Sequence, residues 1–204
     1  MIDLYTWPTP NGHKVQIMLE ETGLDFRIHP VDLGENEQFE PEFLAISPSG
    51  KIPAIVDDDG PGGERLSIFE SGAILLYLAE KSGLFLPPDS GGRWEAISWL
   101  MFQMGGIGPM LGQAGYFLNK APDPIPAAIE RYTRETERLY GVVDRRLAEV
   151  EFLAGEYSIA DISCFPWLRV HERLGIDVGD YPNVGRWLET INARPAVQRG
   201  LDLL

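Results

Sequence analysis

The sequence predicts an α/β first half followed by an all-helical second half, and three observations lead to this prediction. Over residues 1–81, strand patterns and helical patterns follow one another in the order β-α-β-α-β-β-α. Residues 82–92 are rich in proline, glycine and serine and break all periodicity. Residues 93–204 carry only helical patterns. We therefore expect a domain at 1–81, a linker at 82–92 and a helical domain at 93–204.

The elements of the first half are predicted from apolar spacing and turn residues. Residues 2–6 alternate as a strand does, and two prolines stop them in the turn 7–12. Apolar residues at helical spacing predict a helix over 14–22, which Gly23 ends. A right-handed crossover then leads to the second strand. The other predicted elements are strands at 26–33, 52–56 and 66–68, a short helix or turn at 41–46 and a helix at 70–81.

The second half is predicted to consist of helices separated by glycine or proline. Glycines within residues 105–109 must bend or interrupt the chain. Ser158 and Asp161 have the spacing of a helix-capping box. The predicted helices are 93–104, the long amphipathic segment 125–150, the very apolar segment 162–170 and a last helix at 183–193.

Charge and composition exclude several classes of function. The chain has 17 basic and 31 acidic residues, a net charge of -14 and a pI of about 4.6. Such a surface repels nucleic-acid backbones and anionic membranes, and the basic residues form no compensating patch. No apolar run reaches the length of a membrane span, and the first residues lack the pattern of a signal peptide. We expect a cytoplasmic protein that binds neither nucleic acid nor membrane.

Cysteine and histidine usage argues against metal and protein-thiol chemistry. One cysteine cannot form an internal disulfide, a redox pair or a thiolate zinc site. Three dispersed histidines show no metal-ligand spacing, so we expect no metal. Cys164, within a very apolar segment, is interpreted as a small buried side chain rather than a nucleophile.

Three short motifs are candidates for a ligand site. Thr9 and Asn11 precede a helix, where donors and the helix N-terminus stabilise a thiolate; alternatively, they only cap the helix. Pro53 opens a strand and, if its peptide bond is cis, presents the Ile52 backbone to a peptide-like ligand; alternatively, it is an ordinary proline at a strand start. Glu70 could hold an amino group and Ser71 a carboxylate at a helix start, or both could be capping residues.

Together these motifs resemble the cytosolic glutathione transferase superfamily over nearly the whole chain. The similarity is greatest to the bacterial Nu class, a group of glutathione-dependent disulfide-bond reductases. It implies a thioredoxin-like, glutathione-binding N-terminal domain, an all-α C-terminal domain and a homodimer. The segments that carry the resemblance are 8–14, 31–34, residue 38, 49–53, 69–81, 105–113, 129–132 and the 158–161 capping box.

The resemblance implies a role for each matching residue. Thr9 and Asn11 would stand beside the glutathione sulfur, where the usual catalytic tyrosine, serine or cysteine is missing. The other implied glutathione-binding residues are Gln38 and Lys51 for the glycyl end, Ile52 before a cis Pro53 for the cysteinyl moiety, Glu70 and Ser71 for the γ-glutamyl end, and Arg131 from the helical domain.

The chemistry implied is reduction of a small or protein disulfide by glutathione thiols. One alternative is conjugation of an electrophile or reduction of a peroxide, with Trp94, Met101, Phe117 and Trp167 forming an apolar pocket or simply part of the core. Another is a non-catalytic binding or assembly module.

Tyr5 is expected inside the first strand rather than at its end. The glycines at 105, 106 and 108 either make room for a second glutathione or allow tight helix packing.

Overall fold

The computed structural model describes all 204 residues, which form two compact units. The first unit contains Met1–Leu84 together with Arg194–Leu204, and the second contains Phe85–Ala193. The helical domain expected at 93–204 is therefore shorter at its C-terminal end, because residues 194–204 belong with the first unit. The segment between helices is also shorter than 82–92. Helix α3 (Ser71–Ser82) includes the first of these residues, and α4 (Ser90–Phe102) begins where the Asp89 side chain accepts from the Gly92 N–H.

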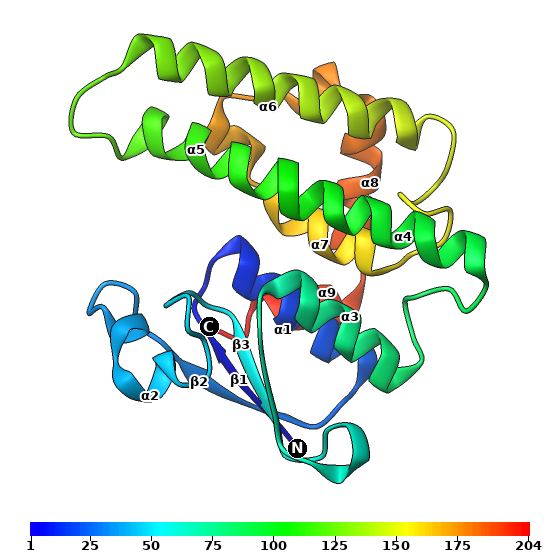
Figure 1. Cartoon of the computed structure of the whole chain (residues 1–204). Helices are drawn as coiled ribbons and strands as arrows, with labels where there is room; N and C mark the ends of the chain where they lie inside the picture. The colour runs from blue at the N-terminus through cyan, green and yellow to red at the C-terminus, as the bar shows by residue number, and fades with distance from the viewer. The chain divides into compact units, whose positions relative to one another are not determined.

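The first unit is built on a four-stranded sheet of order β2-β1-β3-β4 (Figure 1). The strands are β1 (Ile2–Thr6), β2 (Phe26–Pro30), β3 (Ala54–Asp57) and β4 (Leu66–Phe69). Strand β1 pairs parallel with β2 and antiparallel with β3, which pairs antiparallel with β4. The β-α-β-α-β-β-α order is confirmed. The second strand ends earlier than the predicted residue 33, and the third begins later than residue 52.

Helices cover both faces of this sheet (Figure 1). Along β1, Ile2, Leu4 and Thr6 are buried and alternate with the less buried Asp3 and Tyr5. Thr6 faces α1 (Pro10–Thr22), because a Cβ on Gly12 would lie 2.6 Å from the Thr6 Oγ1, and Ile2 and Leu4 share its side of the strand. The Tyr5 side chain lies on the opposite side, where its ring is 6.4 Å from that of Phe43 in α2 (Pro41–Leu44). Because side chains alternate along a strand, β1 therefore contributes residues to the packing on both sides of the sheet.

Helix α1 begins earlier than the predicted residue 14. Thr9 has an extended backbone, its Oγ1 accepts from the Gly12 N–H at 3.2 Å, and Pro10 occupies the first helical turn. Both features are favourable at a helix start. Gly23 ends the helix with a φ of 65°, as predicted.

Helix α9 (Pro195–Leu201) was not predicted, since the sequence pattern had indicated a last helix ending at residue 193. It packs against α1 so closely that a Cβ on Gly200 would lie 2.8 Å from the Ile17 Cα. Arg194 makes two hydrogen bonds, of 2.6 and 3.0 Å, to the carboxylate of Glu21 in α1. These contacts explain why the C-terminal residues belong to the first unit.

The second unit is all helical. No helix of the chain is long and apolar enough to span a membrane. The glycine-rich stretch forms a π-helical turn, Gln103–Ile107, which leads directly into α5, a helix that was not predicted. The main helices are α4, α5 (Gly108–Asn119), α6 (Pro126–Leu147), α7 (Ile159–Leu168) and α8 (Pro182–Asn192).

The predicted capping box at the start of α7 is confirmed. The Ser158 Oγ accepts from the Ala160 N–H at 3.2 Å, and the Asp161 carboxylate accepts from the Ser158 N–H at 3.1 Å. Asp161 is fully buried and also accepts from the Leu153 N–H and the Trp187 Nε1–H, at 3.0 and 2.9 Å. One carboxylate thus joins the start of α7 to the preceding turn and to α8.

Candidate functional site

A small cavity of about 40 Å³ lies in the first unit, where three chain segments meet at one end of the sheet. The register explains why they meet: Ala54 pairs with both Tyr5 and Phe69, so the end of β1, the start of β3 and the end of β4 share one edge of the sheet. The residues lining the cavity are Asn11, Ser49, Lys51, Ile52, Pro53, Glu70 and Ser71. The fold therefore brings together residues from all three motifs singled out in the sequence.

The start of α1 contributes Asn11 to the cavity, and Thr9 lies beside it in sequence. Pro10 has no N–H to offer a ligand, and the His13 N–H bonds to the Thr9 carbonyl at 2.9 Å. The Thr9 hydroxyl uses a lone pair to cap the helix and retains its proton as a donor. Thr9 can therefore cap the helix and at the same time donate a hydrogen bond to the sulfur of a bound thiol.

The loop before β3 contributes Lys51 and Ile52. The Ile52–Pro53 peptide bond is cis. The buried Ser47 hydroxyl donates to the Lys51 carbonyl at 2.8 Å, and Ile52 packs on a core cluster that includes Phe43. These contacts hold the loop at the edge of the cavity.

Gln38 lies beside the same loop without lining the cavity. Gly50 has a φ of 61°, and a Cβ on it would lie 3.4 Å from the Gln38 carbonyl oxygen and 3.0 Å from the Phe39 ring. The Gln38 Oε1 is buried without a hydrogen-bond partner. The Gln38 backbone therefore lies against the loop that lines the cavity.

The start of α3 contributes adjacent residues of different chemistry, Glu70 and Ser71. Glu70 has a φ of 71° and a ψ of 117°, its side chain makes no capping hydrogen bond, and the residue lines the cavity. Ser71 is buried, and its Oγ accepts from the Nζ of Lys14 at 3.1 Å. Sequence reasoning missed Lys14, whose only signal is a charged residue within an apolar helical segment.

Glu70→Gly is expected to weaken ligand binding without lowering stability. The variant loses the carboxylate, but glycine adopts a positive φ without the cost of about 1 kcal/mol or more that other residues incur. Thermal unfolding should show an unchanged or higher midpoint, while calorimetry with glutathione should show weaker binding. Glu70→Gln, which keeps the backbone strain, is the control. A glycine variant that binds as tightly as the wild type would argue against a ligand contact by this carboxylate.

Arg131 lies in the second unit, on α6. It lines a cavity of about 710 Å³ together with Met110, Ala127, Glu130, Tyr132, Arg134, Glu135 and Arg138. Within this group Arg134 pairs with Glu130, and Arg138 donates two hydrogen bonds to Glu135, at 2.8 and 2.7 Å. The Glu135 pKa is lowered chiefly by the bond from Arg138.

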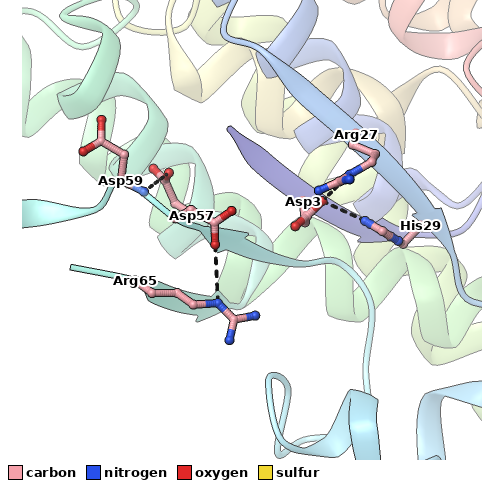
Figure 2. A network of polar contacts seen from close by, with 7 residues as sticks. Asp3, Arg27, His29, Asp57, Asp59 and Arg65 are labelled. Carbon is pink, nitrogen blue, oxygen red and sulfur yellow. Dashed lines mark hydrogen bonds and ion pairs between the residues drawn. The ribbon is translucent and has the colours of Figure 1, made fainter. Parts of the chain in front are cut away.

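Tyr5 is inside the first strand, as expected, and does not line the small cavity. Its ring stacks on His29, with centroids 4.6 Å apart. Figure 2 shows His29 and Arg27 pointing at the Asp3 carboxylate, each 2.8 Å from the same oxygen. The bond from Arg27 is the main cause of a lowered Asp3 pKa. Cys164 is fully buried in α7, as predicted.

The glycines of the π-helical turn and α5 differ in their surroundings. A Cβ on Gly106 would contact Leu139 at 3.6 Å, and one on Gly108 would lie 2.8 Å from the Gln103 Nε2, which favours the packing interpretation. A Cβ on Gly105 would meet nothing within 4 Å. On α4, Trp94 and Met101 are 64% and 48% exposed. The interpretation of these two residues as part of the core is therefore wrong.

Comparison with known proteins agrees with this architecture. Residues 1–80 match the N-terminal domain of glutathione S-transferase, and residues 109–195 match its C-terminal domain. The chain is 57% identical over 203 residues to the disulfide-bond oxidoreductase YfcG of Escherichia coli K12, covering 98% of this chain and 94% of YfcG.

Solved structures give the same result. A glutathione transferase from Burkholderia graminis, with two glutathione molecules bound per subunit, has a TM-score of 0.95 and 50% identity, over 99% of this chain and 88% of that chain. A glutathione transferase from Pseudomonas putida, with one glutathione disulfide bound per subunit, has a TM-score of 0.95 and 48% identity. The match covers 99% of this chain and 91% of that chain. The chain therefore belongs to the glutathione S-transferase family, with a thioredoxin-like N-terminal domain and a helical C-terminal domain.

Proposed function

We propose that this chain is a glutathione-dependent disulfide-bond oxidoreductase that uses glutathione thiols in place of a protein cysteine. The observation that carries the proposal is the small cavity, which gathers complementary groups for a peptide thiol while the only cysteine is buried in another unit. A reductant that arrives with its own thiol accounts for both facts.

The residues around the cavity fit the charged ends of glutathione. Glu70 would bind the γ-glutamyl amino group, and Ser71, at the start of a helix, the neighbouring carboxylate. Ile52 would exchange backbone hydrogen bonds with the cysteinyl moiety. Lys51 and Gln38 would bind the glycyl carboxylate at the other end of the loop.

The glutathione sulfur would then lie at the start of α1. The Asn11 amide and the Thr9 hydroxyl would donate to it, and the helix N-terminus would lower the pKa of the thiol. A thiolate formed there attacks one sulfur of the substrate disulfide and releases the other as a thiol. A second glutathione attacks the mixed disulfide. Two glutathione thiols thus become one glutathione disulfide while the substrate gains two electrons and two protons.

The similar proteins support this assignment. YfcG is named a disulfide-bond oxidoreductase, and the two solved relatives hold two glutathiones or one glutathione disulfide per subunit. These are the reactant and product of the proposed exchange. We infer that this chain, too, holds two glutathione moieties during turnover.

The proposal predicts turnover of 2-hydroxyethyl disulfide with glutathione, measured by coupling glutathione disulfide to its reduction by NADPH. Wild-type turnover should far exceed the conjugation of an electrophilic aromatic substrate. Asn11→Ala should lower kcat/KM for the disulfide about a hundredfold, the order seen when a donor to a developing anion is removed. Thr9→Ala should lower it about tenfold and cost about 1 kcal/mol of stability as a lost cap. Thr9→Ser, which keeps the hydroxyl, is the control.

The alternatives give different results in the same experiment. Conjugation that exceeds disulfide turnover would identify an ordinary transferase. No turnover of either substrate, with glutathione still bound, would identify a binding or assembly module. Full disulfide activity in both alanine variants would contradict the assignment of Thr9 and Asn11.

We further propose a cytoplasmic homodimer. The cytoplasm maintains reduced glutathione, which the reaction consumes. Family membership supports dimerisation, and Arg131, an exposed residue of α6, would reach a glutathione site either in its own subunit or in the partner. The molar mass in solution, measured by light scattering, tests the dimer.

A further inference from the structure

Lys14 is a buried lysine next to the proposed glutathione site. Its side chain is 1% exposed, and its Nζ donates to the Ser71 Oγ at 3.1 Å. Burying an ammonium costs several kcal/mol unless its surroundings compensate, so lysine is seldom fully buried. A buried ammonium is held by hydrogen bonds and nearby dipoles, so the groups around Lys14 indicate what its charge acts on.

Ser71, a hydrogen-bond partner of Lys14, suggests a role for that charge. Ser71 is the first residue of α3 and lines the small cavity, so the ammonium lies behind a helix N-terminus that faces the cavity. A hydroxyl that accepts from an ammonium keeps its own proton as a donor to a second acceptor. The positive charge and the helix dipole act in the same direction, and both favour an anion at Ser71.

We propose that Lys14 is a positioning residue that acts through Ser71 to bind the α-carboxylate of the γ-glutamyl residue of glutathione. This inference rests on the proposed function. The α-amino and α-carboxylate groups of that residue share one carbon atom, and Glu70 and Ser71 are adjacent in the chain. A negative side chain beside a serine backed by a lysine is complementary to such a zwitterionic end.

The test compares two ligands that differ only in this carboxylate. These are glutathione and 4-aminobutyryl-cysteinyl-glycine, which lacks the α-carboxylate, and their Kd values are measured by calorimetry. In Lys14→Met the Kd of glutathione should rise about ten- to a hundredfold, the range for a hydrogen bond strengthened by a charge, while that of the analogue changes less than about twofold. Lys51→Met is the matched control, because it should weaken both ligands by the same factor.

A purely structural role for Lys14 would give equal losses for the two ligands and would overturn the inference. If Lys14→Met does not fold, Lys14→Gln keeps a hydrogen-bond donor without the charge and should show the same selective loss. Wild-type protein that binds no glutathione would overturn both this inference and the proposed function. Wild-type protein that binds glutathione without reducing a disulfide would contradict the proposed reaction only, and the comparison of ligands would still decide the role of Lys14.

Discussion

Asp161→Ala is expected to lower the free energy of unfolding by about 4 kcal/mol. The substitution removes the acceptor for three buried N–H donors, those of Leu153, Ser158 and Trp187, and each buried donor without a partner costs about 1–3 kcal/mol. Chemical denaturation monitored by fluorescence measures the loss. The effect should reach α8 as well as α7, since Trp187 belongs to α8.

Two further variants and the pH dependence separate this network from an ordinary cap. Asp89→Ala removes the exposed cap of α4 and should cost only about 1 kcal/mol. Asp161→Asn should have an intermediate effect, because one amide oxygen can still accept from Leu153 and Trp187.

Burial raises the pKa of Asp161 to about 6, so the folded state holds this proton more tightly than the unfolded state. The difference in unfolding free energy between wild type and Asp161→Ala should therefore grow as the pH falls from 6 to 4. A difference that shrinks over this range would contradict the raised pKa.

Gly12→Ala is expected to lower both stability and glutathione binding. The new Cβ would lie 2.2 Å from the Trp7 carbonyl oxygen and 2.6 Å from the Thr6 Oγ1, so the start of α1 must move away from the end of β1. Overpacking of this kind costs roughly 1–3 kcal/mol, and a backbone neighbour places the variant at the upper end. A displacement of Asn11 by about 1 Å could lower turnover about a hundredfold.

Gly105→Ala is the matched control. A Cβ at residue 105 meets nothing within 4 Å, so the variant should be as stable as the wild type or gain up to about 1 kcal/mol. Thermal unfolding of both variants makes the comparison of stability, and glutathione calorimetry on Gly12→Ala measures the loss of binding. Equal stability of the two variants would show that the close approach at Gly12 is relieved without cost.

Local sequence was sufficient wherever the interacting residues are close together in the chain. The Ser158–Asp161 capping box forms as predicted, as does the stop of α1 at Gly23. These features depend on hydrogen bonds and backbone conformations within a few residues, so their pattern is visible in the sequence.

Strand ends were predicted less well, because a strand is only as long as its partner allows. The second strand was predicted to residue 33 but ends at Pro30, which pairs with Thr6, the last residue of β1. The third strand begins at Ala54 rather than residue 52, because Ala54 pairs with Tyr5. Register with a distant segment sets these limits.

The sequence by itself determined the order of the elements, the helix caps and the motifs from which a glutathione site was inferred. The tertiary structure alone decided that α9 packs on α1 through Gly200, that Lys14 is buried against Ser71, and that three separate motifs line one cavity. The physical reason is that each of these contacts joins residues far apart in the chain. Their proximity depends on strand register and helix packing, which no local pattern encodes.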